Sequence, residues 1–485
     1  MRNEPTAWRA APRTMLLSGG LGLFLIWVVS LAAVGGYAQR ELSIVSVVGV
    51  VAVCISVVSY RLIRDPAALA DPLIWFLLAC GTYFGFGPLA YHYATPQTIA
   101  FMDAFYPVSP SALSQAQFVS VTGILLVVTT AFILWRLISR AAASPATVKP
   151  ANQRTLVFVA IVLLSLGGAV RFGLVVPRGL GLLLWTTPGS IEMLGELYKG
   201  GLGLAVILAL GGRRRWKWVA TIAASVDMLA GLVLLSKLEV LSVIAVIGVA
   251  EQLVRPGFMR LARTGLVMVI VYLAMAPLVG IGRVAGYGAL TSLESVKQAT
   301  QALALQGESK TNIQVWWARL AYTNQQAFAI EQYHQGKPGD TIANTLKIGF
   351  VPRFLVPDKP LLTTGGRYTE LVLGRDIQTA TCPTTFAEGY WNAGWVGLIG
   401  VALWLGLVLG AFSALASWMT ASMRHEYFPV LLFGIKMGYR PDDWFVITYV
   451  LPLVYLLAVA VFIFLLCQMA GRYRANAPFP SLGSS

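Results

Sequence analysis

Charged residues are scarce in this chain of 485 residues. Asp, Glu, Lys and Arg together make up 12% of the sequence and hydrophobic residues 57%, whereas ordinary soluble domains carry roughly 25% charged residues. The mean hydropathy is correspondingly high, at +0.71. This composition excludes an ordinary water-soluble domain and predicts an all-α polytopic membrane protein.

Cysteine and histidine are also few, with four and three residues. Three of the cysteines lie in apolar runs, which leaves Cys382 alone in a polar segment, so neither a disulfide framework nor a metal-spaced set can form. The histidines are far apart, and no His-x-x-x-His or Asp-x-Asp pair occurs. We therefore predict no metal site.

Sequence motifs for nucleotide-driven and serine-hydrolase chemistry are missing as well. The chain contains no Walker loop, no dinucleotide-binding fingerprint and no Gly-x-Ser-x-Gly elbow. Each of these motifs supplies a backbone cradle or an activated nucleophile that its chemistry requires. The sequence thus predicts a function without a nucleotide or another cofactor.

The net charge of +15 is not distributed as in a nucleic-acid-binding protein, because no basic groove with interleaved aromatic residues is present. The cations instead form short clusters between apolar runs, which is typical of residues that set membrane topology and contact anionic lipid. With the N-terminus inside, the cations of the cytoplasmic segments outnumber those of the opposite side's short segments by more than two to one. We expect both termini in the cytoplasm.

Apolar runs of roughly 20 residues can cross a bilayer, and the chain has about twelve runs near that length. They cover residues 15–34, 42–58, 73–91, 118–137, 156–176, 198–210, 219–235, 238–254, 266–281, 396–416, 428–437 and 445–467. The pattern predicts a membrane domain over 1–281 with about nine spans, a loop domain over 282–391, and a C-terminal membrane segment over 392–485 with about three spans. The topology places the loop outside, in the periplasm.

The long loop has its own predicted elements. Apolar residues recur at helical spacing in 312–334, and Asp340 is a candidate N-cap for a helix over 341–350. Three prolines make 351–360 extended, and 368–373 predicts one further helical turn. Such helices could lie on the membrane surface and cover a cavity.

Cations on the outer side need a reason other than lipid electrostatics. They include Arg171, Arg178, Lys237, Arg319, Arg353 and Lys359. A diphosphate requires such donors, since guanidinium is planar, always charged and able to bind two oxygens at once. The alternative is that these side chains extend to the membrane interface or pair with the loop's own carboxylates.

Three titratable residues are candidates for chemistry. Glu388, ringed by Tyr390 and Trp391 at the membrane edge, would be partly desolvated and suited to general-base catalysis, although it could equally be a helix cap or an interfacial anchor. His334 is a rival base, or a solvated residue at a helix end. Asp227 within a predicted span is a proton or ion site, or simply pairs across the bundle. Asp442-Asp443 is interpreted as a hairpin tip.

Two short motifs carry a resemblance to a known family. The first comprises Pro352-Arg353, Pro357-Asp358-Lys359-Pro360 and Glu388-Gly389-Tyr390-x-Asn392-x-Gly394 before a membrane span. The second is Arg178 with Gly189 after ten intervening residues. Together with about twelve spans and one late outer loop, they resemble the Wzy-type O-antigen polymerases, which polymerise oligosaccharide repeat units.

The resemblance implies a GT-C-like fold in the bacterial inner membrane and a metal-independent glycosyltransferase. Its substrate would be an oligosaccharide linked to undecaprenyl diphosphate, and a chain-length regulator is a further partner that such an enzyme could have. Glu388 would be the base. Arg178, Arg353, Arg171, Arg319 and Lys237 would bind the diphosphate, with Tyr390, Trp391, His334 and Lys359 as sugar or acceptor contacts. The alternatives are an O-antigen ligase, in which His334 gains importance as base, and a flippase or other transporter of lipid-linked glycan.

Overall fold

A computed structural model describes residues 7–35, 39–141, 152–183, 189–234, 236–285, 315–351, 364–373 and 381–476. All secondary structure in these segments is helical, which confirms the all-α fold class. The predicted extended segment 351–360, with Arg353 and Lys359, lies outside the described residues apart from its first residue.

Nine helices of the described part are long and apolar enough to cross a membrane, so the protein is a polytopic helical membrane protein. Of the other three predicted spans, 15–34 retains only the shorter apolar stretch Gly19–Val34 in the described residues. The helix at 238–254 carries three charged residues within eighteen, and the one at 428–437 is only eleven residues long. A count of twelve stays a prediction.

The helices form two compact units that follow packing rather than chain order. Unit 1 comprises Met1–Ala142, Gln306–Ala416 and Gly434–Leu453, and unit 2 comprises Ala143–Leu305, Ser417–Phe433 and Val454–Ser485. The described residues of the predicted loop from 315 onward therefore belong to the same unit as the first spans. The predicted boundaries at 281 and 391 concern membrane topology and stay a prediction.

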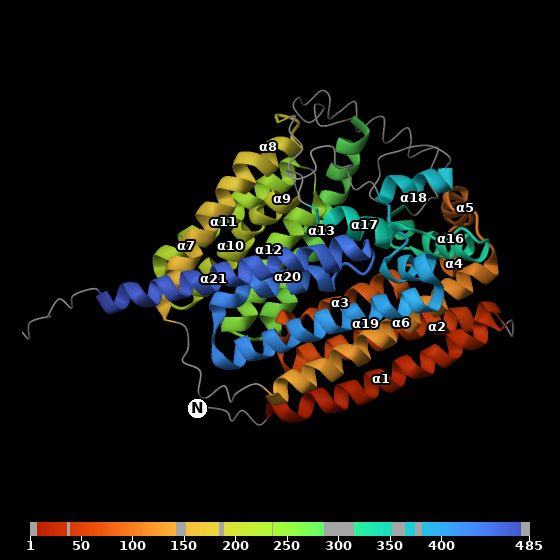
Figure 1. Ribbon diagram of the computed structural model, residues 1–485, viewed down its shortest axis with the longest axis horizontal. Helices are drawn as coiled ribbons and strands as arrows, with labels where there is room; N and C mark the ends of the chain where they lie inside the picture. Colours follow the sequence, from red (N-terminus) through yellow and green to blue (C-terminus); the bar gives the residue numbers. More distant parts are fainter. Residues whose placement is uncertain are drawn as a thin grey trace, which may run out of the picture. The chain divides into compact units, whose positions relative to one another are not determined.

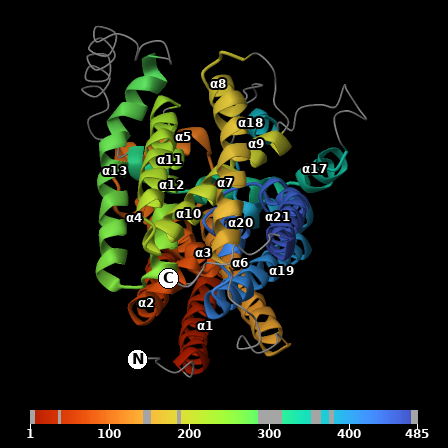
Figure 2. The same cartoon turned by 90° about the vertical axis from the view of Figure 1, so that its left-hand side faces the viewer.

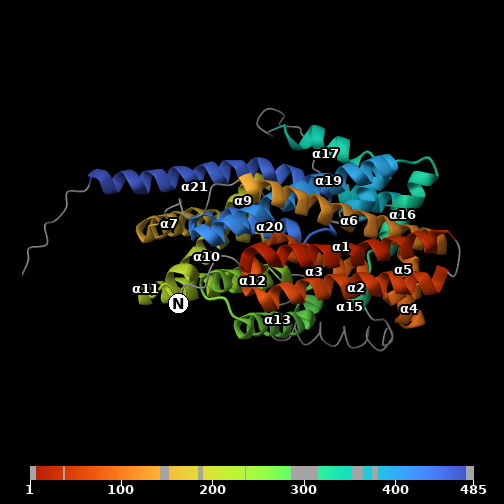
Figure 3. The same cartoon turned by 90° about the horizontal axis from the view of Figure 1, so that it is seen from below.

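Unit 1 is built on long helices that lie side by side (Figure 1 and Figure 3). Its N-terminal elements are α1 Ala7–Val34, α2 Gln39–Arg64, η1 Pro66–Ala70, α3 Pro72–Cys80, η2 Gly81–Phe86, α4 Ala90–Tyr93, α5 Pro96–Phe105 and α6 Pro110–Ala141. α1 packs against α2 and α6. Asp71 and Thr95 cap α3 and α5 through side-chain oxygens, each followed by a proline at the first helical position, as expected for helix starts.

The later part of unit 1 adds short helices at one end of this bundle. These are α15 Val315–Ala318, α16 Thr323–His334, α17 Thr341–Gly349 and α18 Thr364–Leu373, followed by α19 Thr385–Ser422, α20 Phe428–Gly438, η7 Val446–Val450 and α21 Leu451–Asn476, of which the last residues of α19, the first of α20 and most of α21 belong to unit 2. The predicted helix 312–334 is divided in two between Ala318 and Thr323. α16 packs on α6.

α19 changes direction at Ala393 and Gly394, where the backbone leaves helical geometry. Gly394 has a φ of 59°, and a Cβ there would lie 2.6 Å from the Tyr333 hydroxyl oxygen, so the kink requires glycine. The kink separates the short segment that carries Glu388 from the apolar remainder of the helix.

Unit 2 contains a second helical bundle. Its elements are α7 Gln153–Val170, η4 Arg171–Val175, α8 Val176–Gly179, α9 Gly189–Gly195, α10 Leu197–Leu210, α11 Arg214–Val233, α12 Lys237–Val254, α13 Phe258–Ala285 and η6 His425–Tyr427. α10 packs against α7, α11 and α12, and α12 against α13, as Figure 2 shows for the green helices. Gly167 allows the close approach of α7 and α10, since a Cβ would lie 2.2 Å from the Tyr198 nitrogen, which is typical of membrane helix contacts.

Candidate functional site

A cavity of about 560 Å³ opens at the end of unit 1 that carries α16. The polypeptide between α15 and α16 forms one wall, and the 439–445 connection between α20 and η7 forms another. The lining residues are Phe101, Met102, Tyr106, Ala318, Arg319, Ala321, Tyr322, Asn324, Gln325, Thr381, Cys382, Arg440, Asp442 and Asp443. We call this cavity the charged pocket.

Two arginines and two carboxylates give the charged pocket its chemistry. Arg440 donates from Nη2 to Asp443 Oδ2 at 2.7 Å, so these two charges largely compensate one another. Asp442 Oδ2 accepts a hydrogen bond of 3.0 Å from the Tyr322 hydroxyl. Arg319 is exposed and makes no ion pair with any residue that the structure describes. Arg319 and Asp442 therefore line the cavity without an ion pair to a described residue.

The 439–445 connection, which we call the tip, carries these carboxylates and is held by hydrogen bonds from Thr385 at the start of α19. Thr385 donates from its backbone nitrogen to the Pro441 carbonyl at 3.1 Å and from its hydroxyl to the Asp443 carbonyl at 2.6 Å. Thr384 adopts a φ of 83°, a conformation that β-branched residues rarely adopt. Such strain is maintained only where the surrounding structure enforces it. The two hydrogen bonds from Thr385 thus hold the backbone on either side of Asp442.

Burial changes the acid–base properties of the pocket. Loss of water raises the pKa of Asp442 to about 6, against the attraction of Arg440 and helped by the nearby Asp443 carboxylate. Burial also raises the pKa of Tyr106 to about 12. The pKa of the Cys382 thiol rises through burial as well. Cys382 is therefore protonated and not a nucleophile, whereas Asp442 can exchange a proton near neutral pH.

Two buried side-chain oxygens of residues that line the charged pocket have no partner among the described residues. The amide nitrogen of Asn324, which is 3% exposed, donates to Asp103 Oδ1 at 3.0 Å and to the Tyr106 carbonyl at 3.3 Å. Its Oδ1 and the Oε1 of Gln325 accept no hydrogen bond from a described residue. Buried polar atoms of this kind are rare because each lost hydrogen bond costs about 1–3 kcal/mol.

Glu388 lies beneath the tip rather than on the lining of the charged pocket. It is 1% exposed, and both of its carboxylate oxygens accept hydrogen bonds. Oε1 accepts from the Thr341 hydroxyl at 2.8 Å and Oε2 from the Phe445 backbone nitrogen at 2.6 Å. The carboxylate therefore joins α17 and the 439–445 tip to α19.

The rest of the Glu388–Asn392 motif also fixes α17. Asn392 Oδ1 accepts from the Ile342 backbone nitrogen at 3.1 Å, and its amide donates to the Thr341 hydroxyl at 3.0 Å. Asp340 occupies the N-cap position of α17 as predicted, but its side chain makes no capping hydrogen bond. Asn392 supplies the cap from another element, which local sequence rules cannot anticipate.

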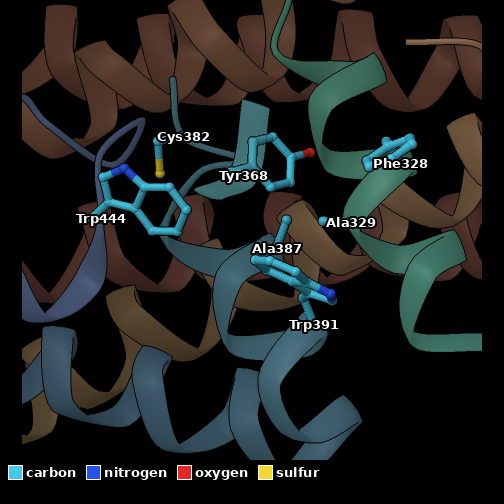
Figure 4. Packing of buried hydrophobic residues seen from close by; sticks show 7 residues of the cluster. All are labelled: Phe328, Ala329, Tyr368, Cys382, Ala387, Trp391 and Trp444. Carbon is cyan, nitrogen blue, oxygen red and sulfur yellow. The ribbon is translucent and has the colours of Figure 1, made fainter. Parts of the chain in front are cut away.

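Trp391 belongs to an aromatic cluster in the interior of unit 1. Tyr368 is at its centre, within ring contact of Phe328, Trp391 and Trp444 (Figure 4). The Trp391 indole donates to the Lys337 carbonyl at 3.1 Å. Trp391 is thus a core residue that supports the 337–342 segment.

His334 is exposed at the end of α16 and contacts Tyr390. Its Nε2 lies 2.8 Å from Gln115 Nε2 and 3.3 Å from the Tyr390 hydroxyl. The Tyr390 ring also packs on Tyr333. Tyr390 is 2% exposed, and neither His334 nor Tyr390 lines the charged pocket.

In unit 2 the structure engages Arg171 in a buried ion-pair network. Its Nε pairs with Asp227 Oδ1, and its Nη2 lies 2.6 Å from Glu239 Oε2. Lys199 Nζ approaches the same Glu239 oxygen at 2.7 Å and Glu196 at 3.5 Å. Arg171 is 3% exposed and Asp227 fully buried. Arg171 and Asp227, which the sequence analysis selected for separate reasons, are thus partners in one ion-pair network.

The other sequence candidates are separated by the division into units. Arg178 lies half-buried on α8 in unit 2. Lys237 begins α12 in unit 2, with Nζ 4.9 Å from the Tyr272 ring centroid. Among the described residues of unit 1, Arg319 is the predicted diphosphate ligand that lines the charged pocket. Arg353 and Lys359 lie outside the described residues.

The charged residues Arg440, Asp442 and Asp443 were not identified as site residues from the sequence, and Asp442-Asp443 was interpreted as a hairpin tip. The available signal was an arginine and two acids within one short connection between apolar segments, on the side predicted to be outside. Within the described segments, no group of three or more His, Cys, Asp or Glu side chains is placed to hold a metal ion.

Comparisons with known proteins give no relative for this chain: no family model, no curated protein and no solved structure matches it.

Proposed function

We propose that this protein is a membrane glycosyltransferase that polymerises oligosaccharide repeat units carried on undecaprenyl diphosphate. The observation that carries the proposal is the charged pocket, in which Arg319, free of ion pairs to described residues, shares one cavity with Asp442. Glycosyl transfer from a diphosphate-linked donor requires two groups: a cation that binds the diphosphate and a base that accepts the proton of the acceptor hydroxyl. Tyr106 and Tyr322 add ring faces of the kind that pack on sugars.

The reaction proceeds by displacement at the anomeric carbon of the donor. The acceptor hydroxyl oxygen forms a bond to this carbon while the bond from the carbon to the phosphate oxygen breaks. The hydroxyl proton passes to the Asp442 carboxylate, and the bonding electrons leave with undecaprenyl diphosphate. Arg319 stabilises the negative charge that develops on the leaving group, as preorganised cations do in phosphate chemistry. The configuration at the anomeric carbon inverts.

Asp442 is the proposed base because it lines the cavity and has a pKa of about 6, near the working pH at which a base is most effective. Glu388 is the proposed positioning residue. Its bond to the Phe445 nitrogen fixes the tip three residues after Asp442. Arg178, Arg353 and Lys359 remain candidate ligands of the diphosphate or the sugars.

The apolar helices support a membrane location for the protein, and a polyprenyl carrier dissolves in a membrane. We place the protein in the bacterial inner membrane with both termini in the cytoplasm and the charged pocket at the periplasmic face. The cation distribution of the sequence supports this orientation through the positive-inside rule. No ATP is available there, which suits a donor that carries its own diphosphate leaving group.

The proposal is tested with full-length protein in lipid nanodiscs supplied with an undecaprenyl-diphosphate-linked repeat unit. The wild type should produce a ladder of polymers, which gel electrophoresis of the glycan detects. Asp442→Asn and Arg319→Ala should lose about 10²–10⁴-fold in rate. The matched controls Glu370→Gln and Lys347→Ala change exposed charges away from the pocket and should polymerise normally. A wild-type ladder from both pocket variants contradicts the proposal.

An O-antigen ligase uses the same donor but passes the glycan to a lipid acceptor, so a deletion strain distinguishes the two activities. Loss of a polymerase leaves single repeat units or no polymer. Loss of a ligase leaves polymer on the carrier. His334 is the residue whose substitution should matter in the ligase, and His334→Gln should have little effect on the polymerase.

A transporter of lipid-linked glycan is a second candidate because unit 2 contains a buried charge network. Arg171, Lys199, Asp227 and Glu239 lie together among membrane helices, and charges in such a position commonly mark an ion or substrate pathway. Translocation of a fluorescent lipid-linked glycan in proteoliposomes tests this. Translocation that Asp227→Asn abolishes supports the transporter, whereas polymerisation without translocation supports the glycosyltransferase.

A further inference from the structure

Unit 1 contains a second cavity, of about 300 Å³, which we call the neutral pocket. It lies among the ends of α2, α4 and α6 and the start of α16. The polar lining side chains are Ser43, Tyr91, His92, Ser114, Gln117 and Thr323, and the remainder are proline, valine and leucine. Among the residues that the structure describes, no Asp, Glu, Lys or Arg lines it. It is therefore unsuited to a phosphate, which needs cationic or backbone donors.

Two hydroxyl groups of the neutral pocket have no partner in the described part of the chain. They are the Oγ1 of Thr323, a residue that is 5% exposed, and the Tyr91 hydroxyl. The neighbouring Gln117 is bonded, with its amide donating to the Phe84 carbonyl at 3.1 Å. Buried hydroxyls normally find a partner, because an unmade hydrogen bond is costly. Both residues line the cavity, so a ligand bound there would lie next to two hydroxyl groups that no described residue satisfies.

The two pockets share the beginning of α16. Tyr322 and Asn324 line the charged pocket, and Thr323 between them lines the neutral pocket. Successive residues at a helix start point to different sides, so this turn forms a wall common to both cavities. A glycan whose reacting sugar occupies the charged pocket can therefore have another sugar close to Thr323.

We propose that the neutral pocket binds an uncharged sugar residue of the glycan substrate, with the Thr323 and Tyr91 hydroxyls hydrogen-bonded to sugar hydroxyls. Hydroxyl and amide groups supply donors and acceptors, and the proline and tyrosine rings supply apolar faces for the C–H groups of a pyranose. The identity of the ligand as glycan rests on the proposed function. The unpartnered hydroxyls and the lack of charge do not depend on it.

The test uses Tyr91→Phe and Thr323→Val, which remove the two hydroxyls with little change of shape. Because neither hydroxyl has a partner among the described residues, the midpoint of thermal unfolding should be unchanged or raised. Binding of the repeat-unit oligosaccharide, freed from its lipid diphosphate, should weaken about tenfold for each hydrogen bond lost. Binding of undecaprenyl diphosphate alone should not change. Tyr93→Phe, which alters an exposed tyrosine outside both pockets, is the matched control.

Normal oligosaccharide binding by both variants overturns this proposal, even if the wild type polymerises glycan. Weaker binding accompanied by a lower unfolding midpoint also overturns it, because the hydroxyls would then support the fold. If the variants lose oligosaccharide binding as expected but the wild type polymerises nothing, the sugar site stands and the proposed function fails. The two proposals thus have separate readouts.

Discussion

Replacement of Glu388 by glutamine separates a base from a positioning residue. The Glu388 carboxylate accepts hydrogen bonds from the Phe445 backbone nitrogen and the Thr341 hydroxyl. A glutamine amide offers one oxygen to the Phe445 nitrogen and can donate its NH₂ group to the Thr341 oxygen. Both contacts can therefore be kept, and we expect a loss of about 1 kcal/mol in the free energy of unfolding. The polymerisation rate should fall less than about tenfold, since this contact does not carry the proton transfer.

Glu388→Ala removes both acceptors from the same position. The Phe445 N–H and the Thr341 hydroxyl lose their partner in a site that is 1% exposed. At about 1–3 kcal/mol for each group left unpaired, the unfolding free energy should fall by about 2–5 kcal/mol. The tip bearing Asp442 then loses an anchor, so activity should fall together with stability. The alanine variant thus measures what the anchor contributes.

The assay combines thermal unfolding in nanodiscs with the rate of polymer formation for both Glu388 variants and Asp442→Asn. Our reasoning expects the order of rates to be wild type, Glu388→Gln, Glu388→Ala, then Asp442→Asn. A folded Glu388→Gln variant that loses 10²–10⁴-fold in rate, beside an active Asp442→Asn variant, would refute it. Glu388 would then be the base, as the sequence motif predicts.

Further predictions concern pH, the buried network and the undescribed loop. The wild-type rate should fall about tenfold for each pH unit below the Asp442 pKa of about 6, because the base must be ionised. The same raised pKa should make the free energy of unfolding decline as pH rises from the ordinary carboxyl pKa to about 6. Measurements of the rate and of unfolding across pH 4–8 check the sign of both effects. Asp227→Asn should lower the unfolding free energy by about 3–5 kcal/mol by breaking a buried ion pair, whereas joint replacement of Arg171 and Asp227 by methionine and leucine should recover much of it, as denaturant titration can measure. Arg353→Ala should shorten or abolish polymer in a complemented deletion strain, and a normal polymer would remove Arg353 from the site.

The helical elements were largely predictable from the sequence, because their cause is local. An apolar run in a bilayer must satisfy its own backbone hydrogen bonds and so becomes a helix. Pro96 after Thr95 similarly determines the start of α5 within a few residues. The apolar runs at 42–58 and 118–137 lie within helices for the same reason.

The charged pocket was predictable only in part. Arg319 was recognised as an outer cation without a lipid role, because charge and topology can be read from the chain. Arg319 and Asp442 line one cavity because segments about 120 residues apart in the chain pack together, as the hydrogen bond from Tyr322 to Asp442 shows. No periodicity or spacing in the sequence encodes that register.

The sequence by itself determined that this is a helical membrane protein and that its polar chemistry lies in few places. Tertiary structure decided which charges are used internally and which face a cavity. Arg171 and Arg319 are the same residue type and were both predicted as outer cations. Arg171 pairs with Asp227 and Glu239, which are 56 and 68 residues away, whereas Arg319 lines a pocket. The physical reason is that desolvation makes a buried charge find its partner wherever the fold places one, and that partner is determined by helix packing rather than by local sequence.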